Sequence, residues 1–225
     1  MLADPQHPPG GLLEGRALSC RRGRRLLFES LDIRLEPGAI TWLRGTNGSG
    51  KTSLMRILAG LSAPAAGAVL WNGVPLREAG AAVRRGVVYI SHANALKDDL
   101  TLLESLTYLA RLAELPDAEA LALRAIERVG LTGQRKLAVR LLSQGQRRRG
   151  ALARLALDEV PRTWILDEPY DALDSDSIAT LSALIEAQAA RGGAVLLTSH
   201  QAVALAGLRE HALQPPAPPP RRSDS

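Results

Sequence analysis

One octapeptide constrains the fold of this chain more than any other feature. It reads Gly45-Thr46-Asn47-Gly48-Ser49-Gly50-Lys51-Thr52. This fits G-x-x-x-x-G-K-[ST], the P-loop, whose glycines let backbone N–H groups turn inward around a phosphate. An apolar run at Ala39–Leu43 precedes the motif and an apolar helical pattern follows it. A chance match in an arbitrary loop would lack this strand–turn–helix context, so the sequence predicts an α/β core with a helix N-terminus facing phosphate.

The P-loop also assigns chemistry to particular side chains. Lys51 is expected to reach the β- and γ-phosphates of a nucleoside triphosphate, and the Thr52 hydroxyl to ligate Mg²⁺. The nucleotide-binding residues predicted from this segment are Gly45, Thr46, Asn47, Gly48, Ser49, Gly50, Lys51, Thr52 and Ser53.

An acidic pair follows a second apolar run. Asp167 and Glu168 come directly after Trp164-Ile165-Leu166, and the carboxyl ends of parallel strands are where such a sheet presents ligands. Asp167 is expected to hold Mg²⁺, directly or through water, and Glu168 to act as general base toward the attacking water. Taken alone, the pair could equally cap a turn; the P-loop favours the catalytic interpretation.

Short apolar runs elsewhere predict the remaining strands. Ala68–Trp71 and Val74–Leu76 flank Asn72-Gly73, a strong hairpin signal because both turn residues tolerate positive φ. Val87–Ile90, Thr163–Leu166 and Ala194–Thr198 are also predicted strands, and the last two are apolar enough to be buried on both faces of a parallel sheet.

Helical patterns dominate the middle of the chain. Leu123, Ile126 and Val129 are predicted to share one buried helical face that ends at Gly130, and a long helix is expected from Arg147 to Leu157. We expect a nucleotide-binding domain over residues 13–213 with a helical subdomain at about 93–155. The Pro-rich and polar tails, 1–12 and 214–225, are expected to be disordered.

Composition limits the kind of partner. The net charge is +5, with arginines clustered at residues 21–25 and 147–149. Such clusters can contact nucleic acid, anionic lipid, solvent or phosphate. Aromatic residues make up only 3% of the chain and are dispersed, so they offer no platform for stacking bases. We therefore expect no direct nucleic-acid partner, and the arginines near the nucleotide motifs are expected to form a solvated or phosphate-facing surface.

A third motif distinguishes among P-loop proteins. Leu142-Ser143-Gln144-Gly145-Gln146 precedes the helix that begins near Arg147. The Ser143 hydroxyl and the Gly145 N–H can form an anion site, although an ordinary helix cap would look the same. Its position ahead of Asp167 and the arginine-rich sequence after it resemble the signature of ABC-type ATP-binding cassettes. The resemblance implies an α/β P-loop cassette with a mainly parallel core sheet, an antiparallel β subdomain and a helical insert.

The resemblance extends over nearly all of residues 12–205 and implies further roles. ATP would be the nucleotide, and Ser143, Gly145 and Gln146 would contact ATP held by a second copy of the chain in a head-to-tail dimer. Asp171–Asp174 resembles a D-loop, and His200 would contact the γ-phosphate. The catalytic residues implied are Glu168, His200 and Lys51; the metal ligands implied are Thr52, Asp167 and His92.

Two departures from the family pattern leave roles open. His92 stands where such cassettes usually have a glutamine, so its role toward the metal is uncertain. Arg21, Arg22 and Gly23 occupy the region that usually supplies the aromatic residue stacked on adenine, and Phe28 is too late and too apolar in setting. An arginine guanidinium could stack on the base instead, and base selectivity would then be loose.

Several segments resemble a subset of the family, the ATP-binding subunits of cytochrome c maturation complexes. They are Val69–Gly73, Val88–His92, Leu100–Leu106, Trp164–Tyr170 and Leu197–Gln201. This resemblance implies an integral membrane subunit of the CcmB type, further haem-handling subunits, and a peripheral location on the cytoplasmic face of a bacterial inner membrane. The activity implied is ATP hydrolysis that drives haem export or release of a haem-loaded periplasmic chaperone.

Two other functions remain open at this point. The chain could serve another exporter, of drugs, lipid or polysaccharide, or be a soluble ABC ATPase without a transport role. Cargo contacts would lie in the membrane partner, and the four histidines form no haem-binding pattern, so no direct haem ligation is expected.

Overall fold

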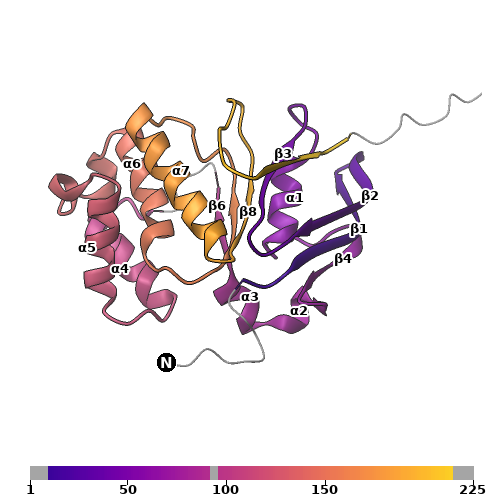
Figure 1. Cartoon of the computed structure of the whole chain (residues 1–225), viewed down its shortest axis with the longest axis horizontal. Coiled ribbons are helices and arrows are strands. Elements are labelled where there is room, and N and C mark those ends of the chain that lie inside the picture. The colour runs from indigo at the N-terminus through magenta and orange to yellow at the C-terminus, as the bar shows by residue number, and fades with distance from the viewer. Residues whose placement is uncertain (1–9, 92–95, 215–225) are drawn as a thin grey trace, which may run out of the picture.

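A computed structural model of the chain describes residues 10–91 and 96–214. It has two sheets with a helical lobe to one side, and the α1 helix lies among the strands (Figure 1). His92 lies outside the described residues, as do most of the two predicted tails.

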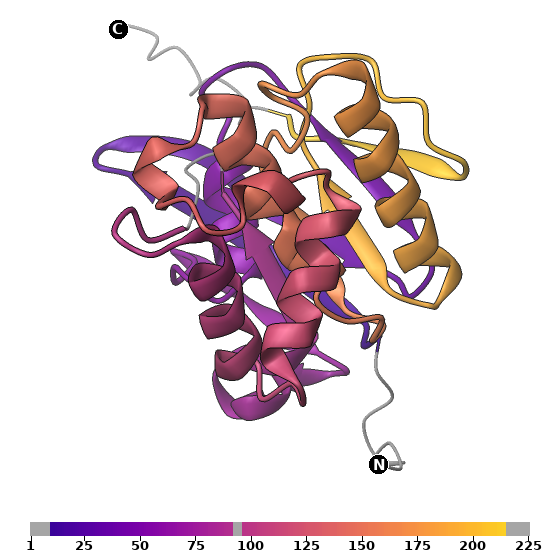
Figure 2. The same cartoon turned by 90° about the vertical axis from the view of Figure 1, so that its left-hand side faces the viewer.

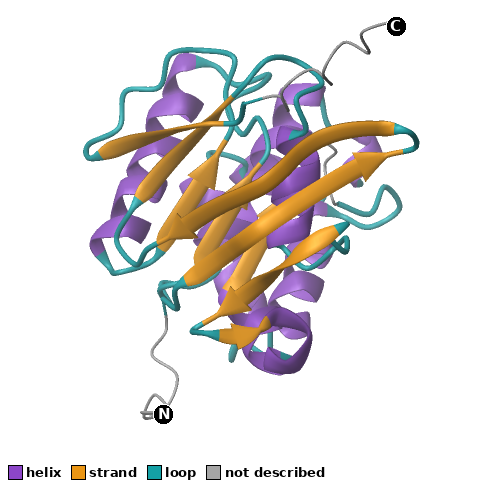
Figure 3. Cartoon of the chain, turned by 90° about the vertical axis from the view of Figure 1, so that its right-hand side faces the viewer, coloured by secondary structure: helices purple, strands orange, loops and turns teal. Residues whose placement is uncertain are grey.

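The first sheet is antiparallel and has the order β2-β1-β4-β5. Its strands are β1 (Leu13–Arg22), β2 (Arg25–Leu35), β4 (Ala66–Trp71) and β5 (Val74–Pro75). Figure 3 shows this sheet face-on, with the long β1 and β2 side by side. The predicted hairpin is confirmed: Asn72 and Gly73 have φ of 50° and 80°, the left-handed values that a tight two-residue turn requires.

The second sheet is parallel and carries the site. Its order is β6-β7-β8-β3-β9, with β6 (Val87–Ile90), β7 (Thr163–Leu166), β8 (Ala194–Leu197), β3 (Ile40–Arg44) and β9 (Leu208–Ala212). Every residue of β7 and β8 is buried, as their continuous apolar runs predicted. Sequence reasoning missed β9, because its polar sequence Leu-Arg-Glu-His-Ala gives no strand signal and only pairing with β3 makes it one.

Helices cover both faces of the parallel sheet. α1 (Lys51–Leu58) buries Leu54, Met55, Ile57 and Leu58 in a core shared by the two sheets. On the opposite face, α7 (Ser175–Ala190) packs Leu181, Leu184 and Ile185 against β3, β7 and β8. The two cores are mainly aliphatic, with Phe28 and Trp71 in one and Trp164 and Tyr170 in the other. They hold β3 and β7 in fixed register, so the ends of these strands are placed rigidly.

The helical lobe has its own core. It contains α4 (Leu102–Leu112), α5 (Ala118–Arg128) and α6 (Gln144–Leu152), with 3-10 turns at Thr132–Gln134, Val139–Leu141 and Ala153–Ala156. Figure 2 shows α4 and α5 packed side by side in front of the sheet. Two short helices, α2 (Leu76–Ala79) and α3 (Ala81–Gly86), lead into β6.

The lobe corrects two sequence predictions. Leu123 is 40% exposed, and the buried face of α5 is formed by Ala122, Ala125 and Ile126, since small alanines let α4 approach closely. The helix predicted to run from Arg147 to Leu157 begins earlier, at Gln144, and changes to a 3-10 turn after Leu152. The predicted end of α5 is confirmed, because Gly130 has φ 69° just beyond the last turn.

Candidate nucleotide site

The P-loop joins β3 to α1. Gly48 and Gly50 have φ of 76° and 105°, and a Cβ on Gly50 would lie 3.1 Å from Leu27 Cβ and 3.2 Å from the Phe28 ring. Glycine is therefore required at position 50 both by its backbone conformation and by the strand packed beneath it. The loop can curl tightly over the N-terminus of α1, where unpaired backbone N–H groups favour an anion.

Lys51 adds its charge at the same place. Its ammonium donates hydrogen bonds to the carbonyl oxygens of Gly45 at 2.7 Å and Thr46 at 3.4 Å. The cation thus lies over the loop that is expected to hold phosphate.

An arginine hairpin lies next to the P-loop. Arg22 and Arg25 face each other across the β1–β2 turn, with Gly23 at φ 60°. A methyl group placed on Gly48 would lie 3.9 Å from the Arg25 guanidinium. Phe28 is 2% exposed in the core, in keeping with its apolar setting, so it presents no ring to a nucleotide.

The acidic pair directly follows β7 and is nearly buried. Asp167 is 5% and Glu168 9% exposed. The Thr198 hydroxyl, at the end of β8, donates to Asp167 Oδ1 at 3.0 Å and accepts from the Glu168 N–H at 2.8 Å. One hydroxyl from the neighbouring strand therefore orients both residues at the carboxyl edge of the sheet.

Glu168 is paired with His200. The His200 N–H donates to Glu168 Oε2 at 3.0 Å, and His200 Nε2 lies 3.4 Å from Oε1. Burial raises the pKa of Glu168; the His200 charge and N–H oppose this rise, while Asp171 and Asp167 add to it. A carboxylate with a raised pKa in a nearly buried position is a better proton acceptor than an exposed one.

The signature caps the helix that follows it. The Ser143 hydroxyl accepts from the Gln146 N–H at 3.2 Å, and the Gln146 side chain accepts from the Ser143 N–H at 3.0 Å, a capping box at the start of α6. A Cβ on Gly145 would lie 3.3 Å from the Ala172 carbonyl oxygen, so the signature packs closely on the predicted D-loop.

The structure does not bring the signature to the P-loop of its own chain. α6 lies in the helical lobe, whereas α1 lies among the strands, in the core shared by the two sheets (Figure 1). Lys51, Asp167, Glu168 and His200 project from the ends of β3, β7 and β8, which are neighbours in one sheet. Ser143 and Gly145 stand apart from them.

Arg148 is a site residue that sequence reasoning missed. The 147–149 cluster is predicted to be a solvated or phosphate-facing surface, yet Arg148 is 3% exposed. Its guanidinium donates to the carbonyl oxygens of Ser91, Asp167 and Glu168. Nothing in the sequence separates Arg148 from its neighbours; only burial does.

Comparisons with known proteins identify the family. Residues 28–171 match the family model described as ABC transporter. Within the part of the chain that the structure describes, no helix is long and apolar enough to cross a membrane.

Two solved structures have the same fold. One, described as an ATP-binding subunit of an ABC transporter, superposes with a TM-score of 0.76 at 29% identity, covering 84% of this chain and 79% of that one. The other, a putative ABC transporter ATP-binding protein from Pyrococcus furiosus, has a TM-score of 0.76 at 25% identity and covers 90% of this chain and 97% of that one.

Three similar curated proteins carry the name cytochrome c biogenesis ATP-binding export protein CcmA. The protein from Dechloromonas aromatica is 46% identical over 192 residues, 85% of this chain and 94% of the relative. The protein from Nitrosomonas europaea is 42% identical over 205 residues, which cover 91% of this chain and 96% of the relative. That from Pseudomonas aeruginosa is 46% identical over 194 residues, 86% and 95%. The chain therefore belongs to the ABC transporter ATP-binding proteins and, within them, to the family of CcmA-type ATPases of cytochrome c biogenesis.

Proposed function

We propose that this chain is the ATP-hydrolysing subunit of a membrane complex for cytochrome c biogenesis, in which hydrolysis drives haem export or release of a haem-loaded periplasmic chaperone. The Glu168–His200 pair beside the P-loop strand supports hydrolysis, and the identity to CcmA proteins along most of the chain supports the process served.

Hydrolysis follows from the residues at the sheet edge. The P-loop N–H groups and Lys51 bind the β- and γ-phosphates of ATP. Glu168 accepts a proton from water as the water oxygen bonds to the γ-phosphorus and the bond to the bridging oxygen breaks, giving ADP and phosphate. His200, whose side chain is 57% exposed, orients Glu168 through its N–H and presents its imidazole toward the γ-phosphate.

The oxygen ligands fit Mg²⁺. Asp167 Oδ1 is held by Thr198, and the Thr52 hydroxyl lies at the start of α1. Carboxylate and hydroxyl oxygens are ligands that Mg²⁺ takes in proteins together with phosphate and water. When bound, Mg²⁺ neutralises phosphate charge; Asp167 and Thr52 are its proposed ligands, and His92, outside the described residues, keeps its predicted role beside it.

Two copies are needed for a complete site. Ser143 and Gly145 are distant from the P-loop of their own chain, so we infer that they bind ATP held by a second copy, head to tail. The α6 N-terminus, with its unpaired N–H groups, suits the γ-phosphate. Gln146 closes the capping box with both its side chain and its backbone N–H, so its proposed part at the nucleotide is to hold Ser143 in place.

Arginines replace the aromatic residue at the base. Arg25 lies beside Gly48, and Arg22 lies opposite Arg25 on the exposed hairpin. A guanidinium can stack on the face of any purine, and stacking makes few hydrogen bonds to the base edges that distinguish one purine from another. We infer that this hairpin holds the base and that selectivity for adenine is loose.

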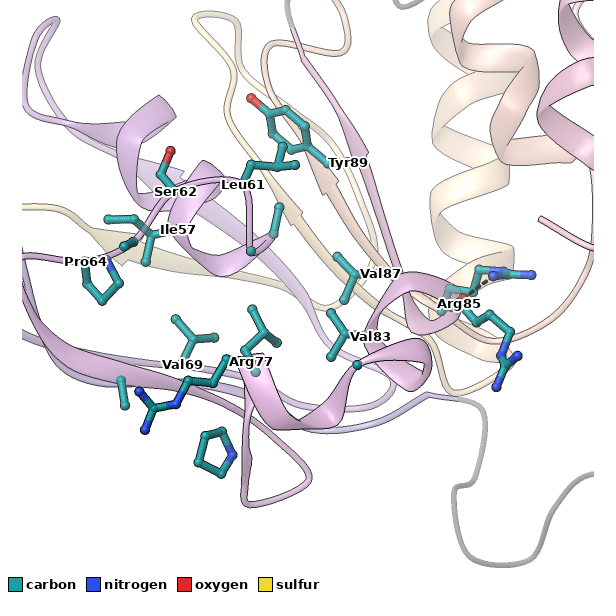
Figure 4. A pocket seen from close by; sticks show the side chains of 18 of the residues that line it. Ile57, Leu61, Ser62, Pro64, Val69, Arg77, Val83, Arg85, Val87 and Tyr89 are labelled. Atoms are coloured by element: carbon teal, nitrogen blue, oxygen red, sulfur yellow. Dashed lines mark hydrogen bonds between the residues drawn. The ribbon is translucent and has the colours of Figure 1, made fainter. Parts of the chain in front are cut away.

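The membrane subunit, of the CcmB type, is proposed to dock in a groove between the helical lobe and the antiparallel sheet. The groove has a volume of about 1180 Å³ and is lined by apolar residues of α1, β4, α3, β6 and α4. Figure 4 shows Leu61, Val69, Val83 and Tyr89 around it. It lies at the C-terminal end of α1, away from the phosphate end.

Charge in the groove indicates what would occupy it. Four arginines line it, Arg77, Arg85, Arg154 and Arg162, and they outnumber the one lining carboxylate, Glu114, which pairs with Arg85 at 3.6 Å. Burial, with the nearby charge of Arg162, lowers the pKa of Arg154. An apolar cytoplasmic segment carrying a carboxylate would complement these groups. The occupied groove would then press on β6, which lines it through Val87 and Tyr89 and leads to Ser91.

An alternative docking face is the His92 loop together with the segment that follows it, from Ala93 to Leu103, which leads into the helical lobe. Residues 93–95 lie outside the described part. Leu96 is half-buried against the core of the lobe, and the exposed residues after it are Lys97, Asp98 and Asp99. Two of the exposed apolar side chains, Leu61 and Leu112, line the groove.

Deletion of the gene, with complementation, tests the proposed function. Cells without the protein are expected to lose c-type cytochromes and keep b-type cytochromes, as read by haem staining of membrane proteins. Wild type should restore the staining and Glu168→Gln should not. Normal c-type staining in the deletion strain, with altered drug tolerance or envelope composition, would assign the ATPase to another exporter.

A further inference from the structure

Arg148 connects the helix of the signature to the peptide of the general base. It lies on α6, five residues after Ser143, and is 3% exposed. One guanidinium nitrogen donates to the carbonyl oxygens of Asp167 at 3.2 Å and Glu168 at 2.5 Å. The other donates to the Ser91 carbonyl oxygen at 3.0 Å. A single side chain of the helical lobe therefore spans the ends of two strands, β6 and β7, of the parallel sheet.

The Asp167–Glu168 segment, to which Arg148 donates its hydrogen bonds, has a strained backbone at Glu168. Glu168 has φ 48°, a left-handed conformation that a glutamate keeps only when its surroundings hold it. Its carbonyl also accepts a bond from the Asp171 N–H at 3.3 Å. In this conformation the carboxylate faces the His200 N–H. The backbone conformation of Glu168 therefore sets the direction in which its carboxylate points.

The hydrogen bonds of Arg148 position the main chain more than they neutralise a charged side chain. All three bonds go to main-chain oxygens, and the guanidinium keeps its planar fork aimed at them. Burial lowers the pKa of Arg148, and the carboxylates of Asp171, Asp167 and Glu168 oppose that effect. Both terminal nitrogens are used on these oxygens, whereas Nε is buried with no hydrogen-bond partner among the described residues. A buried cation with an unused donor is costly, so we read this placement as one kept for geometry.

We propose that Arg148 is a positioning residue for ATP hydrolysis, which holds the Asp167–Glu168 peptide and ties it to the signature helix. The proposal rests on the proposed role of Glu168 as base. When the α6 N-terminus engages the nucleotide of the second copy, the guanidinium transmits the resulting tilt of α6 to the base. The hydrolytic geometry would then be completed only in the closed dimer.

Full-length Arg148→Met and Arg148→Lys proteins, compared with Arg147→Met, test this. Arg147 lies on the same helix and also donates to carbonyl oxygens, those of Leu142 and Arg140, but both are inside the lobe. Arg148→Met is expected to lower kcat between about tenfold and a hundredfold, as a small misplacement of a catalytic group does, while the KM for ATP changes less than about threefold. Arg148→Lys, whose ammonium cannot span all three oxygens, should fall between wild type and Arg148→Met. Arg147→Met, which removes no bond to the Asp167–Glu168 peptide, should lower kcat less than Arg148→Met does.

The pH dependence of kcat separates positioning from folding. A loosened peptide exposes Glu168 to water, which lowers its raised pKa and moves the acid limb of the profile to lower pH. A purely structural role would reduce yield and melting temperature and leave kcat of the folded protein and its acid limb in place. If Arg148→Met does not fold, Arg148→Lys carries the same test. Wild-type kcat and acid limb in both variants, or an equal loss in Arg147→Met, would overturn the proposal.

The results that would contradict the proposed function differ from those that would contradict the role of Arg148. Then wild type would not hydrolyse ATP, or Glu168→Gln would hydrolyse it at the wild-type rate, whatever the Arg148 variants do.

Discussion

The Glu168 carboxylate accepts a hydrogen bond from the His200 backbone N–H at 3.0 Å, and the His200 imidazole nitrogen lies 3.4 Å from its other oxygen. Glu168 and His200, 32 residues apart in sequence, thereby join the segments that follow β7 and β8 at the edge of the sheet. Because one residue supplies both the orienting N–H and an exposed imidazole, the base and the proposed γ-phosphate contact move together.

Substitution of Lys51 should impair ATP binding, whereas substitution of Glu168 should impair hydrolysis. Lys51→Ala removes a charged contact to phosphate, so ATP affinity should fall by about tenfold to a hundredfold. Glu168→Gln removes the base and should slow hydrolysis by about 10² to 10⁴ while ATP affinity is kept. Equilibrium binding of a fluorescent ATP analogue and phosphate release measure the two effects. Wild-type turnover in Glu168→Gln would remove Glu168 as the base.

The chain should dimerise with ATP. Ser143 lies apart from its own P-loop, so a closed site needs a second copy, and blocked hydrolysis should preserve it. Sedimentation velocity of Glu168→Gln is expected to show monomer without nucleotide and dimer with ATP and Mg²⁺. Ser143→Arg, which places bulk and charge at the shared site, should stay monomeric. Absence of ATP-dependent association in Glu168→Gln would contradict the head-to-tail arrangement.

Glu168 should make stability and activity depend on pH. Its folded pKa is raised, chiefly by burial, so ionisation of Glu168 destabilises the fold. That cost is absent below the unfolded pKa and grows as pH rises through the folded one. Glu168→Gln should therefore melt higher than wild type at neutral pH, and the difference should vanish at acid pH. Wild-type ATPase activity should fall as pH drops through the raised pKa. A melting difference that does not change with pH would contradict a raised pKa.

The groove at the C-terminal end of α1 should bind the membrane partner. Leu112 is 67% exposed and lines the groove, so Leu112→Glu should reduce co-purification with the membrane subunit from detergent and leave ATP binding intact. Leu123, also exposed and on the same lobe but outside the groove, provides the control Leu123→Glu. Crosslinks from the partner to the Asn72–Gly73 hairpin instead of Leu61 and Leu112 would place the interface elsewhere.

The sequence by itself determined the fold class and the central chemistry. The P-loop predicted a strand before it and a helix after it because its backbone geometry exists only in that context, and β3 and α1 lie there. The apolar runs of β7 and β8 predicted buried parallel strands because only a sheet covered on both faces accommodates them. Asn72-Gly73 predicted its hairpin because few residue pairs adopt two left-handed conformations in succession.

Tertiary structure decided what local pattern does not encode. β9 is polar and becomes a strand only by pairing with the edge of β3. Arg147, Arg148 and Arg149 are chemically identical, and the approach of α6 to β6 and β7 selects Arg148 for burial. Leu123 fits the helical period of α5, yet the position of α4 leaves it exposed. In each case the outcome depends on which segments distant in sequence pack together, and the free energy of burial is realised only at those contacts.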